Sequence, residues 1–212
     1  MRDLNEVFID GVSLEKILED HKKWVRNEKG GKKAVLRGKD LSQVDFGIFT
    51  SLSMIDFSGA NLEGADLGWS TLEGVDFSEA NLEDANLGWS YLEGADFSEA
   101  NLEGAEFNCA DLTGALFVGA NLDYANLGDA CLERAMLNGA SLREACLDNA
   151  RLESACLRGV NFCNSDLICA NLKNSDLTCA DLSYVDLTDA DLRNCIIDGA
   201  CLDFTRIRNT KF

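Results

Sequence analysis

The chain has 212 residues and a formal net charge of −18, from 37 acidic and 19 basic side chains. Because like charges repel, so acidic a protein is excluded from binding nucleic acid or an anionic membrane surface directly. Hydrophobic residues make up 46% of the chain, too large a share for a disordered acidic tail.

Residues 1–33 are expected to form an N-terminal segment with a capping helix at about residues 13–27. Ser13 can cap its first turn, and Gly30 and Gly31 are expected to stop it. The helix would have one apolar face, made of Leu14, Ile17, Leu18, His21, Trp24 and Val25. His21 is the only histidine, and we interpret it as a packing residue.

A five-residue repeat occupies the rest of the chain. Every fifth residue from Leu52 to Phe212 is Leu, Phe or Ile, at 33 positions without exception. Two residues before each of these lies a small residue, which is Ala at 21 of the 33. The same pattern occurs one residue out of phase at Leu36, Leu41 and Phe46, so a one-residue insertion is expected near Gly47–Ser51.

A period of five fits neither an α-helix nor a simple strand, but it fits a coil with several sides. Residues 67–86 and 87–106 match at 16 of 20 positions. Phenylalanine also recurs at a spacing of 20, at Phe57, Phe77, Phe97 and Phe117. Twenty residues are four pentads, so the sequence predicts coils with four sides.

Tandem Ala-(Asp or Asn)-Leu-x-x units, such as Ala60-Asn61-Leu62 and Ala180-Asp181-Leu182, resemble the pentapeptide-repeat family. The resemblance covers residues 34–212 and implies an all-β fold, a right-handed quadrilateral parallel β-helix. The Leu/Phe and Ala/Ser positions would face inward. About nine coils are expected, stacked ~4.8 Å apart, with the N-terminal helix as a cap.

The negative charge is concentrated in the first half of the repeat. The 94 residues between Lys39 and Arg134 contain 19 acids and no base, whereas residues 1–39 are net +3 and residues 134–212 net −2. Over about 4.7 coils this is roughly one charge per 1.2 Å, comparable with one per ~1.7 Å in duplex DNA. The acids could serve only to keep the rod soluble, or they could form an interaction surface.

The twenty-residue spacing is expected to align these acids in ladders along the rod. The candidate interaction residues are Glu63, Glu83, Glu103 and Asp123 on one edge; Asp56, Asp76 and Asp96 on the next side, with Glu79 and Glu99 beside them; and Glu73 and Glu93 in a shorter ladder.

Trp69 and Trp89 lie one coil apart at outward positions, and Tyr91 follows two residues later. Such residues commonly anchor protein interfaces, but simple stacking between adjacent coils explains them equally well. The nine cysteines include no Cys-x-x-Cys and are interpreted as reduced, small apolar filler rather than as a metal site.

The C-terminus stays in register and shows no second cap. Its open coil would expose unpaired backbone groups, so we expect a homodimer through this end, involving Phe204, Ile207 and Phe212.

No catalytic triad, P-loop, dinucleotide fingerprint or calcium loop is found, so we expect no enzyme, cofactor or metal. With no secretory signal and no apolar run of ~18 residues, a cytoplasmic location is expected.

The quinolone-resistance members of the resembled family are acidic rods that occupy the DNA-binding saddle of DNA gyrase. The resemblance therefore implies a DNA mimic whose partner is a DNA-binding protein such as a gyrase-like topoisomerase. This chain departs from those members: it lacks their projecting loops and C-terminal dimerisation helix and carries an N-terminal helix. The alternative is a passive scaffold or binding module.

Overall fold

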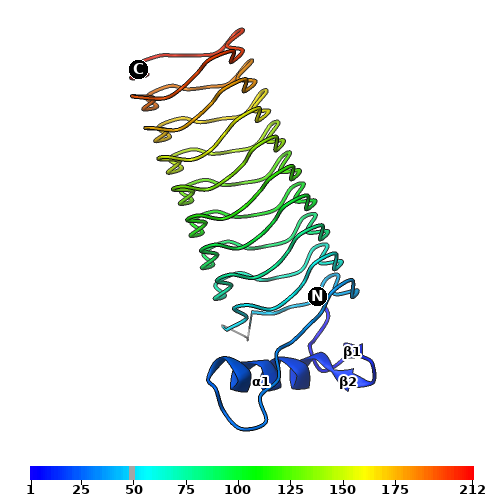
Figure 1. The fold of residues 1–212 in the computed structure, drawn as a ribbon. Coiled ribbons are helices and arrows are strands. Elements are labelled where there is room, and N and C mark those ends of the chain that lie inside the picture. The colour runs from blue at the N-terminus through cyan, green and yellow to red at the C-terminus, as the bar shows by residue number, and fades with distance from the viewer. Residues whose placement is uncertain (48–50) are drawn as a thin grey trace.

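The computed structural model describes residues 1–47 and 51–212. Stacked coils form a long β-helix, with the N-terminal helix and a small hairpin at one end and the C-terminus at the other (Figure 1). The coils advance along the stack in chain order, so each contacts only the coil before it and the coil after it. This is the one-dimensional construction of a solenoid.

Parallel backbone bridges set the length of a coil. Asn61 pairs with Asn81, and Asn81 pairs with Asn101, at a constant offset of twenty residues. Leu62 donates its backbone N–H to the carbonyl of Asn81 at 2.7 Å, and Asn81 donates in turn to Ala60 at 2.9 Å. Because such a bridge recurs every five residues, four pentads complete one turn of the solenoid.

The two regular positions of the pentad fill the interior. Leu62 and Ala65 are both fully buried, and the same holds for their equivalents along the rod up to Leu192. The larger rings stack within this core: Phe57, Phe77 and Phe97 lie parallel at centroid distances of 5.3 and 5.0 Å. The remaining three residues of each pentad therefore form the surface.

A tight turn follows each inward Leu or Phe. In the turn that begins at Leu62, Ala65 donates its N–H to the Leu62 carbonyl at 2.9 Å, and Gly64 has a φ of 60°. A positive φ at the third residue is typical of a type II turn, which favours glycine. The sequence nevertheless places Trp69, Glu79 and other bulky residues at this position, with φ near 60°.

The expected insertion near Gly47–Ser51 falls partly on residues 48–50, which lie outside the described residues. The bridges on either side reveal its effect. Asp45 pairs with Asp66, an offset of 21, whereas Ser51 pairs with Thr71, an offset of 20. One additional residue therefore separates Asp45 from Ser51, as the change of phase predicts.

The N-terminal cap contains a hairpin that the sequence analysis missed. Strand β1 (Phe8–Ile9) pairs antiparallel with β2 (Val12–Ser13). Asp10 and Gly11 join the strands with φ values of 50° and 82°. Two positive φ values are typical of a type I′ turn, which Asp-Gly favours.

Helix α1 (Leu14–Val25) follows directly. The Ser13 side chain accepts a hydrogen bond from the Lys16 N–H, as expected for an N-cap. The helix ends earlier than predicted: Arg26 is its C-cap, and Asn27 takes the left-handed conformation at φ 55°. Gly31 has a different role, because a Cβ there would lie 2.3 Å from the Trp24 backbone nitrogen.

His21 joins the helix to the first coils. It is fully buried, its Nδ1 accepts the Ala34 N–H at 3.0 Å, and its Nε2 lies 2.9 Å from the Ser53 carbonyl. These two bonds require a neutral ring with its proton on Nε2. The packing role expected for His21 thus includes two hydrogen bonds that hold the cap in place.

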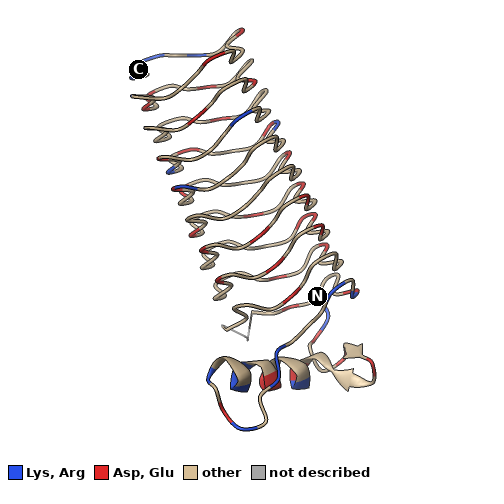
Figure 2. Ribbon diagram, in the orientation of Figure 1, with Lys and Arg blue, Asp and Glu red and all other residues tan. Residues whose placement is uncertain are grey.

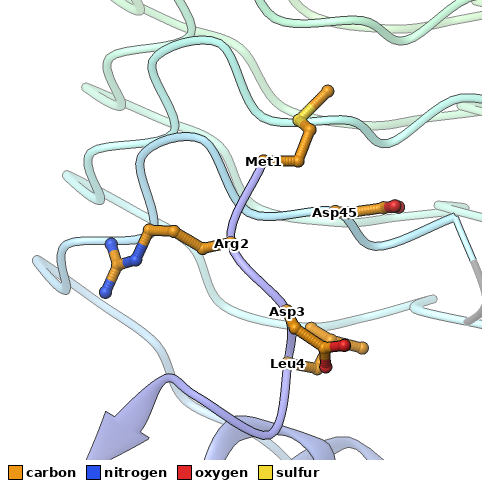
Figure 3. A pocket seen from close by; sticks show the side chains of 5 residues that line it. All are labelled: Met1, Arg2, Asp3, Leu4 and Asp45. Atoms are coloured by element: carbon orange, nitrogen blue, oxygen red, sulfur yellow. The ribbon is translucent and has the colours of Figure 1, made fainter.

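The first residues of the chain pair with the first coil through one parallel bridge. Arg2 pairs with Val44, donating its N–H to Gln43 and accepting from Asp45. Figure 3 shows this segment beside the first coil, with the Arg2 and Asp45 side chains pointing to opposite sides. Residues 1–4 and Asp45 line an open pocket of about 200 Å³. The N-terminal end of the β-helix is thus covered by backbone pairing as well as by α1.

None of the described residues covers the C-terminal end in this way. The inward residues of the last coil are exposed: Ile197 is 37%, Leu202 39%, Ile207 53% and Phe212 61% accessible. Within the described part of the chain, the N–H groups of Ile197, Leu202 and Ile207 donate to no carbonyl. This end therefore presents apolar side chains and free backbone donors together.

The narrow interior should not tolerate a larger or a charged side chain. We expect Ala115→Leu to destabilise the fold by about 1–3 kcal/mol through overpacking, and Leu112→Asp by more because it buries a carboxylate. Val118→Leu, at an exposed outward position three residues after Ala115, is the control and should leave the melting temperature nearly unchanged. A thermal melt unaffected by the two inward substitutions would contradict the assignment of these positions.

The neutral state of His21 predicts a dependence of stability on pH. Burial lowers the pKa of His21 below its ordinary value of 6.5; the Ser53 hydrogen bond opposes this shift and Lys33 adds to it. The unfolded chain therefore binds this proton more strongly. The contribution of His21 to stability is thus fully present above about pH 6.5 and is lost as the pH falls from there through the folded pKa. Denaturant unfolding of the wild type and of His21→Gln between pH 5 and 8 measures the effect. Identical pH profiles for the two would show that His21 does not hold the cap.

Candidate protein-interaction surfaces

The aspartates that precede the inward residues serve the rod itself. Asp56, Asp76 and Asp96 pair in register. Each Oδ1 accepts the backbone N–H of the serine two residues later, at 3.1, 3.0 and 2.9 Å. The same bond recurs at Asp66 and at Asp181. Aspartate at this position thus supports the turn in the manner of an Asx turn, which explains the Asp/Asn preference of the repeat.

The glutamates form a different class of carboxylate. All seven predicted ladder glutamates are exposed, whereas Asp56, Asp76, Asp96 and Asp123 are half-buried. The seven are Glu63, Glu83, Glu103, Glu79, Glu99, Glu73 and Glu93. In the described part of the chain none of them forms an ion pair. Their charge is therefore directed to solvent rather than neutralised within the rod.

Two of the predicted acidic residues do form ion pairs. Arg37 lies 3.4 Å from Asp56, and Arg143 lies 3.9 Å from Asp123. Partial burial raises the pKa of Asp56, but the Ser58 hydrogen bonds and the Arg37 guanidinium together hold it below the ordinary value. These two aspartates are the least available to a partner.

The most extensive glutamate surface covers one side and the turn before it. Glu63, Glu83 and Glu103 stack at twenty-residue intervals beside a ladder of asparagine amides, in which Asn81 donates to Asn61 at 3.1 Å. Asn101 also donates to Glu83, and Asn121 to Glu103. Glu79 and Glu99 lie at the adjoining turn. We call these five glutamates the glutamate face, and Figure 2 shows acids recurring along the first coils.

The third predicted ladder lies elsewhere on the coil. Glu73 and Glu93 follow the inward Leu72 and Leu92, one side away from the Asp56 ladder. Neither carboxylate forms an ion pair with the described residues. Glu73 and Glu93 thus lie on the same side of the rod as Thr71 and Tyr91, which they follow by two residues.

The predicted aromatic residues form a stacked edge. The Trp69 and Trp89 rings lie parallel, 4.9 Å apart at an interplanar angle of 1°. Trp69 is 68%, Trp89 47% and Tyr91 58% exposed. Both tryptophans occupy left-handed turn positions, at φ 59° and 61°. We call these three residues the aromatic edge.

The structure divides the residues predicted for a dimer end into two groups. Ile207 and Phe212 occupy inward positions of the open last coil. Phe204 does not: it lies at a turn on the side of the rod, at φ 59°, and stacks on Tyr184 at 4.9 Å. Its place in the pentad, two residues after Leu202, explains this. Leu202 and Ile197 belong to the open end instead, and the register alone could have identified them.

The interpretation of the cysteines as buried filler is wrong. All nine are free, seven are half-buried, and Cys169 and Cys179 are exposed. Eight of the nine occupy outward positions of the pentad, and only Cys195 occupies a small inward position. The exposure of each cysteine is therefore set by its position in the pentad and not by the apolar character of the free thiol.

Among the described residues, no group of three or more His, Cys, Asp or Glu side chains could hold a metal ion. No helix there has the length and apolar character that a membrane crossing requires. A hollow of about 570 Å³ near the C-terminal end is open and lined by Lys173, Arg193, Asn194 and Phe212. The chemistry of the described surface therefore lies in its ladders rather than in a cavity.

Comparison with known proteins agrees with this architecture. A comparison with curated proteins gave no match. Among solved structures, HetL of the cyanobacterium Nostoc sp. strain PCC 7120, a pentapeptide repeat protein involved in heterocyst differentiation regulation, is 33% identical over 84% of each chain, with a TM-score of 0.42. QnrB1, a plasmid-mediated fluoroquinolone resistance protein, is 17% identical and shares the fold, with a TM-score of 0.59 over 82% of this chain and 91% of its own.

The family model for pentapeptide repeats matches eight copies, in residues 48–79, 80–117, 115–153, 155–194 and 175–212. The matched segments span nearly all of the solenoid, including both tryptophans and the glutamate face. The chain therefore belongs to the pentapeptide-repeat family and folds as a right-handed β-helix.

Proposed function

We propose that this protein is a non-enzymatic acidic rod that acts by binding another protein. Its glutamate face presents ordered negative charge to the DNA-binding surface of that partner, and a gyrase-like topoisomerase is the first candidate. The observation that carries the proposal is the separation of two carboxylate classes. The aspartates support the turns, whereas the ladder glutamates are exposed and form no ion pair within the described chain.

The proposed shape is a four-sided rod of about nine coils, with a rise of ~4.8 Å per coil. Glutamates on successive coils then recur at that rise along the glutamate face. The phosphates of one DNA strand recur at ~3.4 Å, so the two charge patterns are similar in scale. The absence of Lys and Arg between Lys39 and Arg134 keeps this region uniformly negative.

Gyrase ranks first because of the resemblance to quinolone-resistance members of the family. QnrB1, which shares the fold, is described as a fluoroquinolone resistance protein. A DNA-binding surface recognises regularly spaced negative charge and is itself positive. The glutamate face offers such a surface negative charge at regular spacing.

We expect the purified protein to inhibit DNA supercoiling by gyrase, or to protect gyrase from a quinolone. The triple variant Glu63→Gln, Glu83→Gln and Glu103→Gln should weaken this effect by on the order of tenfold or more, because it removes three charges from the binding face. A supercoiling assay with and without a quinolone measures both activities.

The matched control removes three acids from the later coils, with Glu144→Gln, Asp189→Asn and Asp203→Asn. It changes net charge equally and should retain the activity. If neither inhibition nor protection occurs with the wild type, gyrase is not the partner.

The alternative is a passive scaffold in which the acids only keep the rod soluble. The aspartate ladders favour it, because their oxygens serve the rod's own turns. Salt separates the two functions: binding through the glutamate face should weaken steeply as ionic strength rises. A scaffold interface centred on apolar contacts should bind equally well at low and high salt.

We further propose that two copies join at their C-terminal ends as a homodimer. Ile207 and Phe212 are 53% and 61% exposed, beside backbone donors without partners in the described chain. An open β-edge with exposed apolar residues is a template for pairing with another copy.

Light scattering at tens of micromolar should give the mass of a dimer for the wild type. Ile207→Lys combined with Phe212→Lys should give a monomer, because charge repulsion replaces apolar burial at the end face. Phe204→Asn, on the side of the same coil, should remain dimeric. A monomeric wild type would contradict the proposed dimer.

A further inference from the structure

We propose that the aromatic edge is a second binding site, which takes an arginine-bearing segment of a partner protein. The site consists of Trp69, Trp89 and Tyr91 together with the unpaired carboxylates of Glu73 and Glu93. It is distinct from the glutamate face and does not depend on the function proposed above.

The geometry of the edge provides both aromatic surface and charge. Trp69 and Trp89 form a parallel stack with both rings largely exposed. Trp89 leads through Ser90 to Tyr91, which pairs with Thr71 on the coil before it. Glu93 lies two residues beyond Tyr91 on the same side, and therefore about 7 Å along the backbone. An aromatic ring and a free carboxylate are thus presented side by side.

This combination matches a guanidinium better than other groups. Arginine stacks on the faces of Trp and Tyr, and its planar fork binds a carboxylate through two parallel hydrogen bonds. An ammonium is a more strongly hydrated point charge and cannot use both features as well. An acidic partner is excluded, because Glu73 and Glu93 form no ion pair with the described residues and their negative charge would repel it.

A second aromatic stack on the same rod shows that stacking alone does not create this site. Tyr184 and Phe204 also occupy left-handed turn positions and stack at 4.9 Å. Near them Arg206 pairs with Asp186 at 3.2 Å, so this stack already has a cation beside it. The two stacks therefore share their conformation and differ in the charge that surrounds them.

The position of the edge separates it from the glutamate face. Trp69 and Glu79 lie at turns ten residues apart, which is half of the twenty-residue coil. The two turns are therefore on opposite corners of the rod. A partner held on the glutamate face leaves the aromatic edge free, so one rod can bind two partners or two segments of one partner.

The experiment uses a peptide of three Arg-Gly-Gly repeats as the probe, with a Lys-Gly-Gly peptide of the same length for comparison. Trp24, outside the edge, is replaced by Phe so that indole fluorescence reports only on Trp69 and Trp89. We expect saturable quenching by the arginine peptide, with weaker binding of the lysine peptide. Trp69→Gly combined with Trp89→Gly should weaken binding roughly tenfold, and Tyr91→Thr alone roughly threefold. Because the first of these variants has no tryptophan left to report binding, its affinity is measured by calorimetry.

Two matched controls distinguish this site from general attraction to an acidic rod. Tyr184→Gly with Phe204→Gly removes the other stack at the same turn conformation and should leave the affinity unchanged. Glu73→Gln with Glu93→Gln should weaken binding, whereas Glu63→Gln with Glu83→Gln, an equal change of charge, should not.

Equal losses in the two glutamate pairs would overturn the inference, because binding would then follow net charge alone. No loss in the tryptophan or Tyr91 variants, with melting temperatures unchanged, would overturn it as well.

Discussion

The narrowness of the interior is the constraint on which the rest of the molecule depends. Each pentad can place only two side chains inside, one large and one small, and both are fully buried along most of the rod. The remaining three residues must lie outside, whatever their chemistry. The surface is therefore ordered by the core, because a side chain on one coil lies directly beside its counterpart twenty residues away.

Such alignment has opposite consequences for different residue types. Asparagines gain from it, since each amide donates to the next along the ladder. Tryptophans gain stacking. Carboxylates lose, because like charges at opposed positions repel. The aspartates offset this by accepting hydrogen bonds within their own turns. Of the ladder glutamates, Glu83 and Glu103 accept a hydrogen bond from an asparagine amide, and the cationic partner proposed above would relieve the repulsion that remains.

The solenoid and its twenty-residue register could be predicted from the sequence because every inward position repeats the same chemistry. The hairpin at Asp10-Gly11 was equally readable, yet it lies outside the repeat and was overlooked. Two other features could be predicted only from the position of a residue in the pentad, and not from its chemical type. Phe204 lies on the side of the rod because it follows Leu202 by two residues, and the cysteines are accessible because eight of them occupy outward positions. The hydrogen bonds of the aspartates could not be predicted from charge. An aspartate carries the same charge whether its oxygens accept hydrogen bonds from its own turn or remain free to bind another protein.

The constant offset between paired residues has an evolutionary consequence. A segment of twenty residues can be duplicated or removed without changing any neighbour's side or register, because each coil contacts only the coils before and after it. The near-identity of residues 67–86 and 87–106, at 16 of 20 positions, is what such a duplication leaves behind. One event of this kind copies a tryptophan, three ladder glutamates and a core phenylalanine together. Reach and valency can therefore increase in whole-coil units while the cap at the other end is unaffected.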